Sequence, residues 1–147
     1  MAFHFRLDRV LEYRRQKEDQ AMQALAVARQ RQETEKQRLA NLNAELFQQQ
    51  QALSARLADA EQRWLTVCFI NALQEDRRVS RIRLELLDAE TQRCQADLVE
   101  RAREKKLLDT LKDRQAQRYA KEENLREQRE HDETATIRRG RKADAIL

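Results

Sequence analysis

The side chains that could bind a transition metal or form a reactive thiolate are few in this sequence: Cys68, Cys94, His4 and His131. The cysteines lack the CxxC spacing of a zinc or redox site, and each histidine stands alone. A single glycine, Gly140, also excludes the GxxxxGK(S/T) loop that binds nucleotide phosphates. We therefore expect no metal, no cofactor and no enzymatic activity.

The elements that must position any functional side chain are helices. The 147 residues include no proline, and the one glycine lies near the end. Proline and glycine end helices and build turns, whereas the alanine, leucine, glutamate, glutamine, lysine and arginine that dominate here favour helix. Active sites also need loops that converge on a pocket. The sequence thus predicts an all-α protein that works through helical surfaces.

Composition predicts a narrow helical seam rather than a globular core. Charged residues make up 38% of the chain, aromatic residues make up 5%, and the mean hydropathy is -0.98. Disorder is the competing interpretation of so charged a chain. Disordered segments, however, are usually rich in proline, serine and glycine and lack a leucine period.

The net charge of +4 and the pI near 9.3 do not by themselves indicate a nucleic-acid partner. Phosphate binding needs a basic stripe with few carboxylates beside it, whereas both signs alternate along most of this chain. The one clean basic run is Arg138, Arg139, Arg141 and Lys142, which also suits a solvated helix C-terminus. We expect no nucleic-acid partner; the alternative, a helical RNA- or DNA-binding protein, would lose affinity steeply with salt.

The sequence also predicts a cytoplasmic protein. No apolar stretch approaches the roughly 20 residues that span a bilayer, and the N-terminus contains no hydrophobic signal-peptide core. Two cysteines without a disulfide framework fit the same compartment.

Apolar stripes with alternating steps of three and four residues predict a coiled coil. In the first half these are Leu39, Leu42, Leu46, Gln49 and Leu53, continued upstream by Leu11, Arg14, Glu18, Ala21, Leu25 and Ala28. Two steps of four meet at Leu53, before Leu57, so a stutter should unwind the supercoil there. The second half contains Val79, Ile82, Leu86, Ala89, Arg93 and Ala96, and later Leu108, Leu111, Gln115, Arg118, Glu122 and Leu125. A further set, Leu84, Leu87, Cys94 and Leu98, widens the apolar face, so we expect the best burial between Val79 and Leu98.

The fold expected from these stripes is a single coiled-coil hairpin over residues 1–147, with two long antiparallel helices. The polar stretch after Ile70 is the candidate reversal, with Asn71 as a left-handed C-cap and Ser80 as the next N-cap. Helix 1 is then expected over about 5–70, the turn over about 71–79, helix 2 over about 80–139 and a basic tail over 140–147, with Gly140 directly after the last helix. The alternative is one unbroken rod that dimerises; the nearly equal halves favour the hairpin, which buries both stripes within one chain.

The two ends carry more specific patterns. From Phe3 to Arg14 the sequence reads F-x-F-x-L-x-x-V-L-x-x-R, and from Glu127 to Glu133 it reads EQREHDE shortly before the basic tail. Both patterns resemble the FliJ family, the small coiled-coil components of the flagellar type III export apparatus. Length, charge, missing proline and helical periodicity agree with this resemblance over essentially the whole chain.

The resemblance implies a stalk similar to the central coiled coil of rotary ATPases. The paired ends of the hairpin would enter the pore of the hexameric export ATPase FliI, and its side would reach the cytoplasmic domain of the export gate FlhA. Export chaperones are further partners in this scheme, and the protein would be peripheral to the inner membrane, held at the cytoplasmic face through its partners. An adaptor or chaperone escort that binds export substrates or their chaperones is the alternative function.

Two groups of residues are predicted to contact these partners. A two-stranded seam accepts about two residues in seven, so the apolar N-terminal cluster exceeds what one helix can cover. With the C-terminal acidic stretch, it is assigned to the ATPase: Phe3, Phe5, Leu7, Val10, Leu11, Arg14, Gln128, Asp132 and Glu133. The large residues near the expected hairpin tip span more of the helix circumference than one helix covers. They are assigned to the export gate: Trp64, Phe69, Ile70 and Leu73, with burial in a local contact or a dimer seam as the alternative.

Overall fold

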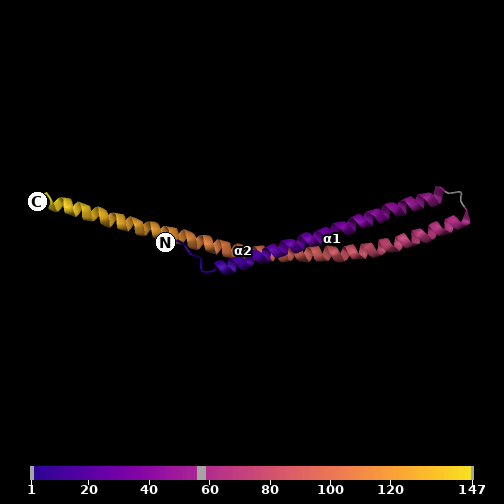
Figure 1. Ribbon diagram of the computed structural model, residues 1–147, viewed down its shortest axis with the longest axis horizontal. Coiled ribbons are helices and arrows are strands. Elements are labelled where there is room, and N and C mark those ends of the chain that lie inside the picture. Colours follow the sequence, from indigo (N-terminus) through magenta and orange to yellow (C-terminus); the bar gives the residue numbers. More distant parts are fainter. Residues whose placement is uncertain (1, 56–58, 147) are drawn as a thin grey trace. The chain divides into compact units, whose positions relative to one another are not determined.

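The computed structural model describes residues 2–55 and 59–146, and nearly all of them are helical. Helix α1 spans Asp8–Ala55 and helix α2 spans Ala60–Asp144. The chain divides into two compact units: unit 1 is Met1–Gln16 with Ala102–Leu147, and unit 2 is Lys17–Arg101. Within each unit the two chain segments run side by side in opposite directions (Figure 1). The prediction of an all-α antiparallel hairpin is confirmed.

The reversal lies earlier in the chain than the sequence suggested. Because α1 ends at Ala55 and α2 begins at Ala60, the predicted turn at 71–79 is wrong, as are the helix boundaries drawn from it. Asn71 and Ser80 lie inside α2 and cap no helix. Residues 71–79 are polar but contain no strong helix breaker, and Arg78 pairs with Glu75 one turn earlier at 2.6 Å. A polar run here marks a solvated helix face, not a turn.

Local signals for the observed reversal are present around Asp59. Its carbonyl oxygen accepts a hydrogen bond from the backbone N–H of Arg63 at 3.2 Å, which makes Asp59 the N-cap of α2. Gln62 follows at the spacing of a capping box. The stutter expected after Leu53 falls in the same stretch, although Leu57 itself lies outside the described residues.

In unit 2, α1 contributes the stripe that its spacing predicts. Ala21, Leu25, Ala28 and Leu46 are buried, and the intervening stripe positions are at least half-buried. The register of α1 against α2 can be followed from the ion pair between Arg31 and Glu90, 3.9 Å from Nη1 to Oε1. This register places the small Ala28 opposite Thr91 and Leu25 opposite Cys94. The seam therefore combines small and large side chains, which keeps the helices close along a narrow contact.

On α2 the buried stripe differs from the main one expected. Val79, Ile82 and Leu86 are 40%, 47% and 68% exposed, so that stripe is wrong. The set expected only to widen the face forms the seam, together with buried Ser80 and Thr91: Leu84, Leu87, Cys94 and Leu98. The later stripe fails in the same way, with Leu108 buried but Leu111 and Leu125 exposed. Both stripes have the spacing of a seam. The stripe that is buried includes the small polar residues Ser80 and Thr91, so it looked less apolar in the sequence.

In unit 1, α2 continues past its predicted end. The helix runs to Asp144, with Arg141 and Lys142 in its last turn, so an end at 139 followed by a basic tail from 140 is wrong. Gly140 is helical, has no positive φ and does not end the helix. One glycine costs a helix only about 1 kcal/mol relative to alanine, and terminal cations complement the helix dipole. Residues 124–146, here called the C-terminal extension, are all exposed.

Candidate partner-binding surfaces

The N-terminal apolar cluster is largely used inside unit 1. Phe5 and Leu11 are each 1% exposed and pack with Leu108 of α2, and Phe3 lies against this cluster. The ring of Phe3 also contacts that of Tyr119, with centroids 5.7 Å apart. Phe5 and Leu11, both predicted ATPase contacts, are therefore inaccessible to a partner while the cluster is packed.

Charged groups hold one flank of the same end. The Nζ of Lys112 lies 2.8 Å from Oδ1 of Asp8 and 5.9 Å from the centroid of the Phe5 ring. Arg15 Nη2 lies 3.7 Å from Oδ1 of Asp109. Arg14, another predicted ATPase contact, is half-buried and donates from Nη1 to the carbonyl oxygen of Glu104 at 2.8 Å. These contacts fix the pairing of α1 and α2 in unit 1.

The opposite flank keeps apolar side chains exposed. Leu7 and Val10 are 37% and 40% exposed, so they are the members of the predicted cluster that a partner can reach. In the register set by the Arg15–Asp109 pair, Val10 and Leu111 occupy facing flank positions, and Leu107 lies one turn before Leu111. Sequence reasoning assigned Leu111 to the seam and did not single out Leu107; only the correct α2 stripe shows that both are exposed.

The C-terminal members of the predicted ATPase contact lie on the C-terminal extension. Gln128, Asp132 and Glu133 are all exposed, on the stretch of α2 that buries no side chain against another described segment. At 1.5 Å per residue, Gln128 lies roughly 14 Å along α2 from Tyr119, where Phe3 packs, and Asp132 is farther still. The structure does not bring these residues against the N-terminal cluster.

The predicted gate residues separate into buried and exposed pairs. Ile70 and Leu73 are 7% and 5% exposed and belong to the hairpin seam of unit 2. Trp64 and Phe69 are 65% and 41% exposed, and Leu65, which the prediction omitted, is 56% exposed. At 100° per residue, Leu65 lies between Trp64 and Phe69 on the helix circumference. The accessible surface near the start of α2 is therefore the group Trp64, Leu65 and Phe69.

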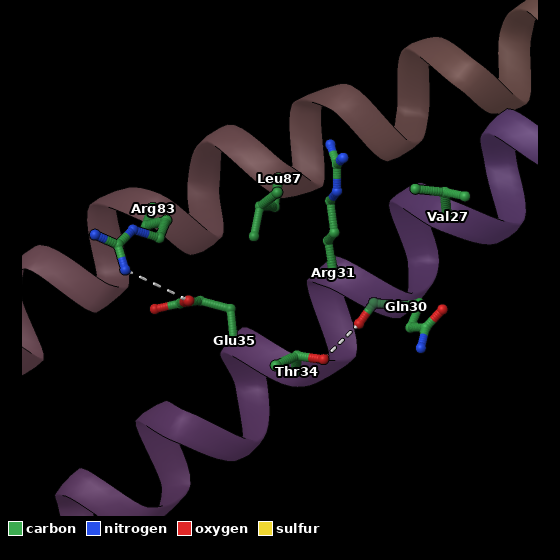
Figure 2. Close-up of a pocket in the computed structure, with 7 residues that line it drawn as sticks. All are labelled: Val27, Gln30, Arg31, Thr34, Glu35, Arg83 and Leu87. Atoms are coloured by element: carbon green, nitrogen blue, oxygen red, sulfur yellow. Dashed lines mark hydrogen bonds and ion pairs between the residues drawn. The ribbon is translucent and has the colours of Figure 1, made fainter.

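The seam of unit 2 also contains a buried carboxylate beside an open groove (Figure 2). Ser80 Oγ donates a hydrogen bond of 2.6 Å to Oε1 of Glu35, and Nη1 of Arg83 lies 3.9 Å from Oε2. The groove measures about 500 Å³ and is lined by Val27, Gln30, Arg31, Thr34, Glu35, Arg83 and Leu87. The carboxylate of Glu35 is paired with the Ser80 hydroxyl and the Arg83 guanidinium. We therefore interpret this group as a structural hydrogen bond rather than a proton-transfer centre.

Two local pairs shift the pKa of a surface group. Burial first, and then the charge of Glu123, raise the pKa of Tyr119 above its usual 10.0, and the phenol donates to Oε1 of Glu123 at 3.2 Å. The hydrogen bond from Arg78 lowers the pKa of Glu75. Neither group faces the groove, so these shifts mark local pairs.

The part of the chain that the structure describes offers few groups for other chemistry. No cluster of three potential metal ligands occurs among these residues, and none of their helices is apolar over a length that would cross a membrane. Cys68 is exposed, Cys94 is half-buried in the seam, and both are free thiols.

Comparison with known families identifies one match. Residues 3–144 fit the family model described as Flagellar FliJ protein. Comparisons with curated proteins and with solved structures gave no significant match.

Proposed function

This chain belongs to the FliJ family, whose members are non-catalytic components of the flagellar export apparatus, and we propose that it acts as the stalk of that apparatus. Unit 1 engages the hexameric export ATPase FliI, and the exposed start of α2 engages the cytoplasmic domain of the export gate FlhA. The protein is then held at the cytoplasmic face of the inner membrane through these partners.

The observation that carries the ATPase contact is the C-terminal extension. In this stretch of helix every side chain is exposed, so no packing within the chain stabilises it. A partner that surrounds the stretch would supply that packing. The exposed Leu7 and Val10 lie farther along the same unit, where the two chain segments pair. We therefore place two successive contacts on unit 1, the extension with Gln128, Asp132 and Glu133 and the apolar flank with Leu7 and Val10.

The test is stimulation of FliI ATP hydrolysis by the full chain. Asp132→Lys with Glu133→Lys, and separately Leu7→Asp with Val10→Asp, should each reduce stimulation about tenfold or more, because each places charge against a contact surface. Circular dichroism should show unchanged helix content.

Matched controls lie on unit 2. Asp19→Lys with Glu33→Lys repeats the charge change, and Val27→Asp repeats the insertion of an acid at an exposed apolar position. Controls should stimulate normally. Full stimulation by both unit 1 variants would reject this end as the ATPase contact and favour the adaptor function, which needs no ring.

The gate contact rests on exposed aromatic area. Trp64 and Phe69 are large and accessible near the start of α2, and such residues are common at binding hot spots. Trp64→Ala with Phe69→Ala should abolish binding to the FlhA cytoplasmic domain in calorimetry while ATPase stimulation persists. Phe47→Ala, which removes an equally exposed aromatic from α1, is the control. Loss of both activities in the double variant would mean that the pair stabilises the hairpin instead.

A further inference from the structure

The apolar stripe that the hairpin leaves unused has the spacing of a second seam. On α2, Leu65, Phe69, Ala72, Asp76, Val79, Arg83 and Leu86 step alternately by four and three residues. Leu65, Phe69, Val79 and Leu86 are 40% to 68% exposed. A regular seam spacing is matched best by another helix, because only a helix presents side chains at the same interval.

The stripe is complementary to itself when two copies run antiparallel. With Asp76 of one copy opposite Val79 of the other, Phe69 lies opposite Leu86, and the small Ala72 lies opposite Arg83. Asp76 and Arg83 of the second copy then occupy neighbouring layers with opposite charges. The two-fold axis repeats both contacts, so each copy offers and receives the same apolar and charged groups.

This stripe meets the groove of Figure 2 at Arg83, which is labelled there among the lining residues. Arg83 belongs to both, and Leu87 of the groove is adjacent in sequence to Leu86. In the antiparallel register, Phe69 of the second copy arrives at the level of Leu86 and can enter this groove. Arg83 remains half-exposed, and its 3.9 Å pair with Glu35 is long, so its guanidinium is free to turn toward Asp76 of the second copy.

We infer that unit 2 self-associates through this second seam into an antiparallel dimer. The stripe is only about 32 Å long, so the interface is small and the dimer is weak. The dimer covers Phe69, and therefore self-association and the proposed gate contact exclude each other. The inference does not depend on that contact, since it rests on the stripe alone.

Sedimentation equilibrium of the full chain tests the dimer. Leu86→Glu should raise the dissociation constant about tenfold or more, because a carboxylate replaces an apolar contact. Leu107→Glu is the matched control, since Leu107 is 69% exposed but lies in unit 1, and it should change the constant less than about twofold. A wild-type chain that stays monomeric up to about 1 mM, or equal effects of the two variants, overturns the inference.

The register has its own test, which uses mixed disulfides. Chains with Cys68→Ala and Asp76→Cys are mixed with chains carrying Cys68→Ala and Val79→Cys, and the mixture is oxidised. Because the register places positions 76 and 79 of different copies opposite each other, the mixed disulfide should form well above the yield obtained with a Leu107→Cys partner. Equal yields overturn the antiparallel register.

Discussion

Unit 1 and unit 2 hold the same two helices together by different means. In unit 1 a few large side chains, Phe5, Leu11 and Leu108, form one cluster that Phe3 and Tyr119 extend. In unit 2 the contact is a long seam of small and large residues interrupted by the buried Glu35 and Ser80. Unit 1 therefore concentrates its stabilisation in single residues, whereas unit 2 spreads it over many layers and uses a polar bond to fix its register.

The largest effect should come from truncation in the unit 1 cluster. Phe5→Ala removes a fully buried aromatic side chain, which typically costs about 3 to 5 kcal/mol. The first turns of α1 should then exchange their amide hydrogens much faster, as measured by hydrogen exchange, and urea unfolding should begin earlier. Leu7→Ala is the control, because Leu7 is partly exposed and contributes less. Equal effects would contradict the concentration of stability in Phe5.

The polar bond of unit 2 should rank second. Ser80→Ala removes the donor at 2.6 Å from a buried carboxylate and should cost about 1 to 3 kcal/mol in urea unfolding. Thr110→Ala, whose hydroxyl is exposed and bonded within its own helix, should cost much less. Adding Glu35→Leu to Ser80→Ala should recover stability, because an apolar pair leaves no unsatisfied charge. If the double variant does not recover stability, the Glu35 carboxylate contributes to the free energy of unfolding as well as to the register.

A smaller effect is expected from the charged flank of unit 1. Lys112→Ala removes the ion pair with Asp8 and the contact with the Phe5 ring, and should cost about 1 kcal/mol. The loss should shrink at high salt, which screens the exposed part of this interaction. Arg126→Ala, which breaks a similar pair with Glu130 on the C-terminal extension, should leave unfolding of the paired segments unchanged. An equal loss in both variants would remove the distinction between paired and unpaired helix.

The smallest effect concerns pH. Because the pKa of Tyr119 is raised above 10.0, the neutral phenol is favoured in the folded state. Its contribution is present below pH 10 and should be lost as pH rises through the raised pKa, where the phenolate repels Glu123. Ultraviolet titration should show this ionisation accompanied by release of Phe3, and Tyr119→Phe should abolish the coupled step. Titration of Tyr119 without any change at Phe3 would contradict the link.

The sequence predicts the hairpin well because the α1 stripe around Leu39 and Leu46 has no competitor. On α2 two stripes share one spacing, so periodicity could not decide between Val79 and Ser80. The turn was predicted at residues 71–79 because they are polar. The weaker indication of a turn lay near Asp59, where a capping residue and the stutter occur in the same stretch. Sequence reasoning therefore predicted the correct fold but placed the reversal too late in the chain. For the same reason it predicted two helices of nearly equal length, whereas α2 is much longer than α1.

The candidate contacts were only partly separable from the core by sequence. Phe5 and Leu7 have the same character and nearly the same position, yet one is buried and the other reachable. The neighbours Ile70 and Phe69 differ in the same way, since Ile70 is buried and Phe69 is exposed. Which of two adjacent apolar residues faces the partner helix depends on a rotation of about 100° per residue, and only the register between helices fixes that angle. The roles assigned to these residues remain predictions.

The exposed C-terminal extension also affects how long the chain survives among proteases. The extension lacks the tertiary packing that supplies most helical stability, and Gly140 weakens it further, so its backbone should open more often than that of the paired helices. Each opening presents arginines such as Arg129, Arg138 and Arg139 to trypsin-like enzymes. Cleavage should trim this segment first and leave the paired helices intact. A partner that encloses the segment would slow this cleavage in proportion to the fraction of chains that are bound. The half-life of the last twenty or so residues therefore measures how much of the protein is in the complex.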